Sequence, residues 1–233
     1  MSKVIGLIGA MNVEVEALEN KLRDRQVTEL GMERFISGNL FGQEAVLAVC
    51  GPGKVNAALC AQSMILHFHP EWILNLGVAG SGECGIGIGD MVIASSTVQH
   101  DMDTTAVGDA PGFVSRIGLI EIPCDLRLKE QLLAAAQSVP KLHVHEGIVA
   151  TGDQFVSSRE IREKIHRQFH AKAIEMEGAA VAHACYMHGV PCGVLRSISD
   201  NADGSAEMDY PTFTRLAASH SQIVVQRVLE GMA

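Results

Sequence analysis

The sequence contains no Cys-x-x-Cys pair that would indicate a zinc or redox motif. Its 6 cysteines are spread along 233 residues, so we expect reduced, mostly buried thiols rather than a disulfide or zinc framework. Basic residues are also few: 18 Lys and Arg stand against 27 Asp and Glu, which gives a net charge of −9. This charge, with no cluster of basic residues, argues against a nucleic-acid partner.

Long apolar runs are missing as well. Hydrophobic residues make up 47% of the chain and the mean hydropathy is +0.18, yet no run reaches the roughly 18 apolar residues that a bilayer span needs. The first apolar run meets Glu14 and Glu16 and lacks the regions of a signal peptide. We therefore expect no membrane association and a cytoplasmic location.

Short apolar runs alternate with helical patterns along the chain, which is typical of an α/β protein. The length suits one domain spanning residues 1–233. We expect a mixed, twisted sheet flanked by helices. The expected strands are 4–8, 35–40, 44–50, 72–76, 90–98, 144–150, 171–176 and 193–199, and the expected helices are 13–21, 54–67, 126–137, 158–169, 178–188 and 210–229.

One segment, residues 101–118, has little periodicity and contains Gly108, Pro111 and Gly112. It is too long for an ordinary connection between elements of a compact domain. Long loops of this kind are often functional. We therefore interpret it as a functional or subunit-contact loop.

Two glycine-rich stretches resemble phosphate-binding loops but do not fit them. Residues 80–85 read Gly-Ser-Gly-Glu-Cys-Gly, yet a β-rich run follows where a dinucleotide-binding loop would open a helix. Residues 51–54 read Gly-Pro-Gly-Lys, but in a P-loop frame the first glycine would fall on Ala48 and the Ser or Thr on Val55. Tight turns and close backbone approach explain both stretches unless a small ligand touches them.

Histidines occur in local pairs that do not have the pattern of a metal site. His166 and His170 are four residues apart but lack the glutamate of His-Glu-x-x-His. His100 is followed by Asp101 and Asp103, yet no separate third ligand is evident. We expect no metal.

Acidic residues follow two of the expected strands. Glu175 and Glu177 end one apolar run, and Asp200 ends another about twenty residues later. Because ligands of α/β proteins bind at the carboxyl ends of strands, these carboxylates are candidates for chemistry. A fourth acid, Glu14, lies in the first turn of the helix expected directly after the first strand and has apolar neighbours at helical spacing, whereas Glu16 has polar ones. A carboxylate on an apolar face is costly unless it is used, so Glu14 is the stronger functional candidate.

The chain carries a series of motifs in order, and together they resemble the 5′-methylthioadenosine/S-adenosylhomocysteine nucleosidase family. The motifs are Ile5-Gly6-Leu7-Ile8-Gly9-Ala10-Met11 with Glu14, Gly77-Val78-Ala79-Gly80, His100-Asp101-Met102-Asp103, Thr151-Gly152-Asp153-Gln154-Phe155, Glu175-Met176-Glu177-Gly178 and Arg196-Ser197-Ile198-Ser199-Asp200. The resemblance covers nearly the whole chain. It implies the nucleoside phosphorylase/hydrolase fold, a homodimer with a neighbouring-subunit loop near the active site, a small nucleoside substrate, and no metal or organic cofactor.

The resemblance also implies catalytic roles. Glu14 corresponds to the acid that activates the attacking water, with Arg196 nearby to hold that glutamate and the water. Asp200 corresponds to the general acid that protonates N7 of adenine, oriented by the Ser199 hydroxyl. Asp200 must be protonated when it acts, and burial would raise its pKa. Glu14 must stay ionised, which a neighbouring Arg196 would favour.

Further positions correspond to the family's substrate contacts. Glu177 matches the carboxylate that binds the ribose hydroxyls, with Met176 against the sugar. Phe155 matches the ring that stacks on adenine, and Val156 offers main-chain contacts to the base edge. Glu175 also lies at a family position, without a clear role.

Three positions depart from the best-known bacterial members. Val78 stands where some have a serine, Val107 where some have a phenylalanine from the neighbouring subunit, and Tyr210 where a phenylalanine usually covers the 5′ substituent. All three concern the substrate. Specificity could therefore shift among methylthioadenosine, adenosylhomocysteine, 5′-deoxyadenosine and 6-amino-6-deoxyfutalosine.

Other activities on the same scaffold remain open from the sequence. A nucleoside phosphorylase would use phosphate, which the charge of Glu14 would repel. A non-catalytic nucleoside-binding protein would need neither Glu14 nor Asp200. A 6-amino-6-deoxyfutalosine nucleosidase of menaquinone synthesis would keep the same bond cleavage with another 5′ group. Hydrolysis of 5′-substituted adenosines to adenine and the free sugar is the expectation that fits best.

Overall fold

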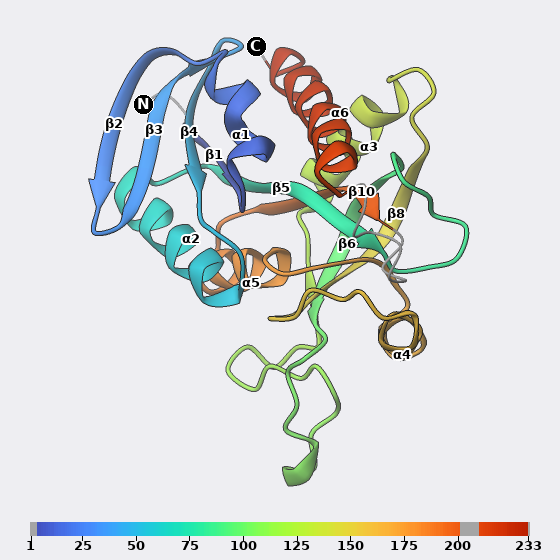
Figure 1. Ribbon diagram of the computed structural model, residues 1–233. Helices are drawn as coiled ribbons and strands as arrows, with labels where there is room; N and C mark the ends of the chain where they lie inside the picture. The colour runs from blue at the N-terminus through green and yellow to red at the C-terminus, as the bar shows by residue number, and fades with distance from the viewer. Residues whose placement is uncertain (1–3, 201–209, 233) are drawn as a thin grey trace.

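A mixed β-sheet forms the centre of the molecule (Figure 1). The computed structural model describes residues 4–200 and 210–232, with the side chains of 210–217 left out. Within these residues ten strands form one sheet. The strands are β1 (Val4–Gly9), β2 (Arg23–Leu30), β3 (Glu33–Leu40), β4 (Gln43–Val49), β5 (Trp72–Ser81), β6 (Met91–Gln99), β7 (Glu121–Pro123), β8 (Val144–Thr151), β9 (Ala171–Glu175) and β10 (Cys192–Asp200).

The sheet closes on itself over half of its width. Its order is β10-β6-β8-β9-β5-β1-β4-β3-β2, and β10 also pairs with β5, so β5, β10, β6, β8 and β9 form a closed ring. Strand β5 runs parallel to β1 and β10, and its last residues pair antiparallel with β9. The strand that joins the two halves of the sheet therefore changes partners at its carboxyl end. Ligands of α/β proteins bind at such switch points.

Helices cover both faces of the sheet. They are α1 (Asn12–Glu19), α2 (Lys54–Phe68), α3 (Leu126–Gln137), α4 (Arg159–Phe169), α5 (Gly178–His188) and α6 (Tyr210–Glu230), with a short 3-10 helix η1 (Thr105–Val107). Helices α1, α3 and α6 share one apolar cluster, and α2 and α5 share another. Along β1, Leu7 packs in the first cluster and Ile8 in the second. Strands buried on both faces in this way have the near-continuous apolar sequence from which they were expected.

Two strands were not expected from the sequence. Strand β2 reads Arg-Asp-Arg-Gln-Val-Thr-Glu-Leu and is largely exposed, because it lies at the sheet edge and pairs only with β3. Strand β7 has three residues and pairs with β6. Strand β5 is also longer than expected: it continues from Leu76 to Ser81 through the glycine-containing turn motif. The expected single sheet flanked by helices is otherwise confirmed.

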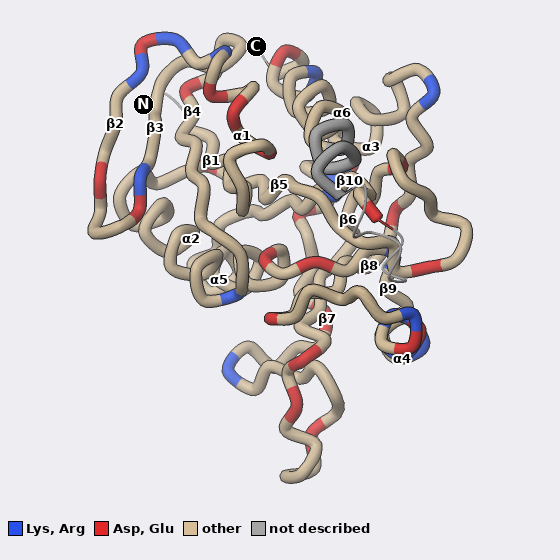
Figure 2. The backbone as a smooth tube through the Cα atoms, in the orientation of Figure 1, with Lys and Arg blue, Asp and Glu red and all other residues tan. Residues whose placement is uncertain are grey.

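The segment between β6 and β7 projects from the body as an arm, which we define as residues 100–120 and which carries η1 at its tip (Figure 1). Strands β1, β5 and β6 carry no Lys, Arg, Asp or Glu, whereas α4 carries charges of both signs (Figure 2). The first and last described residues lie on the side away from the arm (Figure 1). Ile5 and Met232 line one surface depression there. No described helix is long and apolar enough to cross a membrane.

Candidate active site

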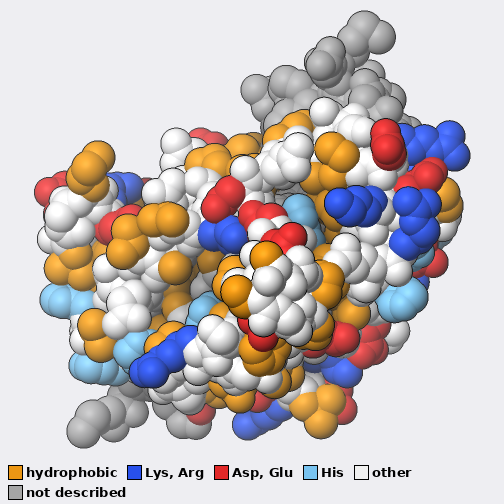
Figure 3. Space-filling model, turned by 90° about the horizontal axis from the view of Figure 1, so that it is seen from below, with side chains coloured by type: hydrophobic (Ala, Val, Ile, Leu, Met, Phe, Trp, Pro, Cys, Tyr) orange, Lys and Arg blue, Asp and Glu red, His pale blue; other side chains and the backbone are white. Residues whose placement is uncertain are grey.

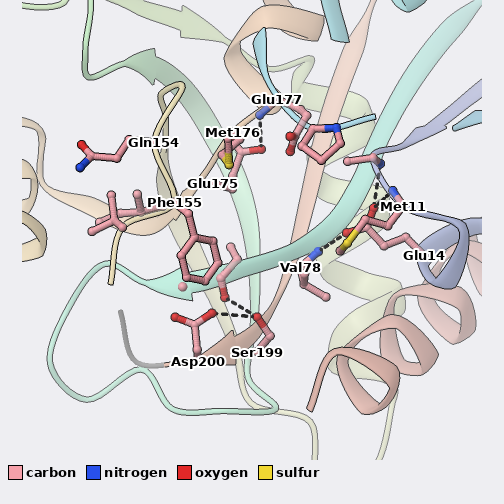
Figure 4. A pocket seen from close by; sticks show the side chains of 16 residues that line it. Met11, Glu14, Val78, Gln154, Phe155, Glu175, Met176, Glu177, Ser199 and Asp200 are labelled. Atoms are coloured by element: carbon pink, nitrogen blue, oxygen red, sulfur yellow. Dashed lines mark hydrogen bonds between the residues drawn. The ribbon is translucent and has the colours of Figure 1, made fainter. Parts of the chain in front are cut away.

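A pocket opens at the carboxyl ends of β1, β5, β9 and β10 (Figure 4). Its walls combine apolar side chains with four acidic ones. It is lined by Ala10, Met11, Glu14, Pro52, Val78, Ala79, Gly80, Gln154, Phe155, Val156, Ile174, Glu175, Met176, Glu177, Ser199 and Asp200. The expected acids, which are far apart in the sequence, thus meet in one cavity.

Glu14 projects from the first turn of α1 toward the pocket, and its side chain is 2% exposed. The Glu14 carboxylate accepts hydrogen bonds from the backbone N–H groups of Ala10 (2.7 Å), Met11 (2.9 Å) and Val78 (2.9 Å). Burial raises the pKa of Glu14 above its ordinary value, and these hydrogen bonds and the charge of Arg196 oppose the shift. The inward orientation inferred from helical spacing is confirmed, and Glu16 is exposed as expected.

Arg196 does not hold Glu14 as we expected. Within the described part of the chain, its guanidinium donates to the Glu175 carboxylate and to Asn75 Oδ1 instead. Arg196 and Glu175 are both almost fully buried. Arg196 acts on Glu14 only through its charge. The expectation failed because the sequence does not reveal which of three nearby carboxylates lies within hydrogen-bonding distance.

Glu175, whose role was unclear from the sequence, holds the first turn of α5. One carboxylate oxygen accepts the backbone N–H groups of Glu177 (2.9 Å) and Gly178 (2.8 Å), and the other accepts the Thr151 hydroxyl. Burial favours the neutral acid, but the Arg196 charge and these hydrogen bonds outweigh it and lower the pKa of Glu175. Glu175 is therefore an ionised structural carboxylate at a helix N-terminus.

Glu177 faces the pocket and lies near Glu175 and Glu14. One of its carboxylate oxygens accepts the backbone N–H of Gly53 at 2.9 Å. Burial, together with the negative charge of Glu175, raises the pKa of Glu177 to about 7. Near neutral pH this carboxylate thus exchanges readily between its neutral and ionised forms.

Asp200 ends β10 on the other side of the pocket and is 3% exposed. The Ser199 hydroxyl donates to Asp200 Oδ2 at 3.0 Å and lies 3.4 Å from the Ala79 carbonyl oxygen. The two residues are paired as expected (Figure 4).

The apolar walls hold the remaining expected contacts. Val78, Val156 and Met176 line the pocket, and the Phe155 ring lies over the Asp200 end of it while remaining 53% exposed (Figure 4). Gln154 points away from the centre (Figure 4). A flat aromatic ring beside a buried carboxyl group suits a planar base that must be both stacked and protonated.

Two expected contacts are not among the described residues that line the pocket, for different reasons. Val107 is 81% exposed on the arm, outside the pocket lining. The backbone of Tyr210 begins α6, but its side chain lies outside the described residues. Within the described residues, no group of three or more His, Cys, Asp or Glu side chains could hold a metal ion.

Comparison with known proteins agrees with this geometry. A family model described as "Phosphorylase superfamily" matches residues 4–230. A 5′-methylthioadenosine/S-adenosylhomocysteine nucleosidase from an Exiguobacterium species is 35% identical over 229 residues, covering 98% of each chain. The chain belongs to this nucleosidase family within the phosphorylase superfamily.

Solved structures of nucleosidases have the same fold. The Neisseria meningitidis 5′-methylthioadenosine/S-adenosylhomocysteine nucleosidase in complex with methylthio-immucillin-A superposes with a TM-score of 0.95 at 34% identity, covering 98% of this chain and 99% of that one. The Helicobacter pylori futalosine hydrolase superposes with a TM-score of 0.94 at 37% identity, covering 99% of both chains. The expected family and fold are thus confirmed.

Sequence reasoning missed three residues that position this nucleosidase-family site. Asn75 is a fully buried amide that bonds Arg196 and also donates to the Ile8 carbonyl oxygen (2.9 Å). Thr151 binds Glu175 and accepts the backbone N–H of Ala179 (2.8 Å). Asn75 is the lone polar residue in the run 72–76, and a buried amide must be satisfied, so it could have been singled out. Gly53, whose N–H binds Glu177, lies in the glycine-rich stretch 51–54, for which the sequence predicts a tight turn.

Proposed function

We propose that this chain hydrolyses the N-glycosidic bond of 5′-substituted adenosines, releasing adenine and the free 5′-substituted ribose. The observation that carries the proposal is the meeting of Glu14, Glu177 and Asp200 around one apolar pocket beside Phe155. The family membership of the whole chain supports it.

The bond cleavage needs a proton on a poor leaving group. In the proposal, the carboxylic acid of Asp200 donates to N7 of adenine, while Phe155 stacks on the base and backbone groups of Val156 contact its edge. The Ser199 hydroxyl orients the Asp200 carboxyl. Asp200 is 3% exposed, and a general acid acts from its protonated form.

The ribosyl centre becomes cationic as the bond breaks and must be captured by water. The Glu14 carboxylate removes a proton from this water. The carboxylate itself is held by backbone N–H groups of the turn before α1 and of β5. The Glu177 carboxylate binds the ribose hydroxyls, and Met176 packs against the sugar. Negative charge from Glu14 and Glu177 beside the sugar stabilises the developing cation.

A phosphorylase reaction on this site is disfavoured by charge. Glu14, Glu175 and Glu177 carry more negative charge than the single Arg196 that faces them. The Arg196 guanidinium is also occupied by Glu175 and Asn75. A phosphate dianion entering this pocket would meet like charges.

A second candidate substrate is 6-amino-6-deoxyfutalosine, which has the same glycosidic bond and a larger 5′ group. The 37% identity to the Helicobacter pylori futalosine hydrolase favours it. Valine rather than a larger side chain at 107 would widen the space for such a group, and the hydroxyl of Tyr210 would make that space more polar. Catalytic efficiencies on this compound, methylthioadenosine, adenosylhomocysteine and 5′-deoxyadenosine would rank the substrates; a strong preference for methylthioadenosine removes this candidate.

We further propose a homodimer in which the arm of one subunit borders the pocket of the other. On α2, Val55, Leu59 and Leu66 are 57–68% exposed, and their spacing of four and seven places them on one helix face. Val107 on the arm is also exposed. Hydrophobic side chains gather around the arm on the face seen in Figure 3. Exposed apolar surface of this kind is typical of a subunit interface.

The test of the proposed reaction is product analysis with and without phosphate. Purified protein is incubated with methylthioadenosine, and adenine, methylthioribose and methylthioribose 1-phosphate are separated by chromatography. We expect adenine and free sugar in equal amounts, independent of phosphate. Formation of the sugar phosphate, or no adenine from any of the four substrates, would contradict the proposal.

A further inference from the structure

The turn between β4 and α2 holds the pocket carboxylate of Glu177 through one backbone amide. Gly53 N–H donates to Glu177 Oε1 at 2.9 Å. Gly53 has φ +100, and Gly51 has φ +80, both in the region that favours glycine. Pro52 between them lines the pocket. The orientation of the Gly53 amide therefore depends on whatever fixes this turn.

Three side chains outside the pocket fix the turn from the other side. Lys54 follows Gly53 directly; its backbone N–H donates to Asp153 Oδ1 at 2.7 Å, and its Nζ donates to Asp101 Oδ1 at 2.6 Å. Asp101 Oδ2 accepts the backbone N–H of Asp153 at 2.9 Å. Lys54, Asp101 and Asp153 thus form a closed ring of hydrogen bonds, which we call the Lys54 ring.

The Lys54 ring joins three elements that meet beside the pocket. Lys54 begins α2, Asp101 lies just past β6 at the base of the arm, and Asp153 lies just past β8. Lys54 Nζ also donates to Gln99 Oε1 at 3.3 Å. Although burial opposes it, the bonds from Lys54 and from the Asp153 amide lower the pKa of Asp101. The ring is therefore held by an ionised carboxylate.

We infer that Lys54, Asp101 and Asp153 are positioning residues that hold the Gly53 amide on Glu177 and thereby keep Glu177 in the form that binds the ribose hydroxyls. This inference rests on the proposed function of Glu177. None of the three residues lines the pocket. Their effect on substrate passes through Gly53.

The direction of the effect follows from the charges around Glu177. Glu175 from β9 and Glu14 from α1 favour its neutral form, whereas Arg196 from β10 and the Gly53 amide favour the carboxylate. The Cys50 thiol, near the end of β4, is also close enough to sense the charge of Glu177. Loss of the Gly53 hydrogen bond removes one of the two groups that favour the carboxylate. The pKa of Glu177 then rises, and ribose binding weakens on the acid side.

The experiment is the pH profile of kcat/KM for the Lys54→Met and Asp101→Ala variants. For the intact enzyme we expect an acid limb near pH 7, the pKa of Glu177. In both variants we expect the acid limb to move to higher pH by about one pH unit, so that kcat/KM at pH 6 falls about tenfold. At pH 9 it should stay within about twofold of the intact enzyme. Lys54→Arg should restore the profile.

The two variants change the net charge in opposite directions, which separates positioning from a simple field effect. If only long-range charge mattered, removing Lys54 would raise the pKa of Glu177 and removing Asp101 would lower it. Limbs that move in opposite directions, or do not move, would overturn the inference. So would a loss of equal size at every pH in a folded variant.

A matched control and a binding measurement complete the test. The Lys129 side chain is 18% exposed and its Nζ lies 2.6 Å from Glu146 Oε1, and the Lys54 side chain is 19% exposed and its Nζ lies 2.6 Å from Asp101 Oδ1. Lys129→Met therefore removes a similar ion pair elsewhere. It should leave the profile unchanged. Calorimetry at pH 6 should show that Lys54→Met and Asp101→Ala bind a non-hydrolysable methylthioadenosine analogue more weakly than the intact enzyme does. Their binding of adenine, which lacks ribose, should be unchanged. If the intact enzyme releases no adenine, the proposed function fails instead.

Discussion

One buried guanidinium faces three buried carboxylates at the heart of this pocket. Arg196 forms its ion pair with Glu175 and affects Glu14 and Glu177 through charge alone. Burial therefore dominates for Glu14 and Glu177, whose pKa values are raised, and not for Glu175, whose pKa is lowered. The three glutamates thus differ in pKa because only Glu175 forms an ion pair with Arg196.

The first prediction at this scale concerns the two groups that transfer protons. Glu14→Gln and Asp200→Asn should each lower kcat at least ~100-fold, the scale expected for a lost general base or acid. Both changes keep the side-chain shape, so the fold should persist. Steady-state kinetics with methylthioadenosine measures the effect, and circular dichroism checks the fold. Near-normal turnover in either variant would remove that residue from its proposed role.

Helical spacing predicted the inward orientation of Glu14, because the side chains three and four positions away are apolar. The same reasoning could not assign the partner of Arg196. Glu14, Glu175 and Glu177 are equally acidic in the sequence, and the choice depends on how β9 and β10 are placed within the closed ring of strands.

At the scale of the elements, the carboxyl half of β5 has to pass close to α1. A Cβ atom added at Gly77 would lie 2.7 Å from Glu14 Oε1. The adjacent Val78 N–H donates to the same oxygen. Glycine at position 77 thus leaves the space that the Glu14 carboxylate occupies.

Gly77→Ala should therefore displace the Glu14 carboxylate and lower kcat at least tenfold, because a catalytic group moved by about 1 Å loses much of its effect. Gly87→Ala is the matched control, since an added Cβ there meets no atom within 4 Å. Its kcat should be unchanged. Equal activities of the two variants would show that Glu14 tolerates the displacement or is not the base.

The strands that the sequence predicted include those buried on both faces, such as β1 and β5. Strand β2 was missed because its exposed face and its edge position leave no apolar pattern, and Val27 is 54% exposed even though it lies in the strand. Strand β7 owes its existence to pairing with β6, a long-range contact that local sequence does not encode.

At the scale of the whole molecule, the arm and the outer face of α2 remain uncovered by this chain. Leu59→Glu should convert the proposed dimer into a monomer, because it places a charge in the centre of the apolar face. Catalytic efficiency should fall with dissociation if the arm borders a neighbouring pocket. Val27→Glu, at a position of similar exposure on β2, is the control and should stay dimeric.

Analytical ultracentrifugation measures both variants. If the Leu59→Glu protein remains a dimer, the subunit interface does not include this face of α2. A fully active monomer would show that the arm has no part in the pocket.

The two ends of the described chain lie together, on the side away from the arm. A fusion partner, an affinity tag or a surface tether attached at either end would therefore leave the pocket entrance and the arm accessible. The closeness of Ile5 and Met232 also makes the chain a candidate for circular permutation with a short linker. New ends at Gly31, in the exposed turn between β2 and β3, would cut the chain far from its chemistry.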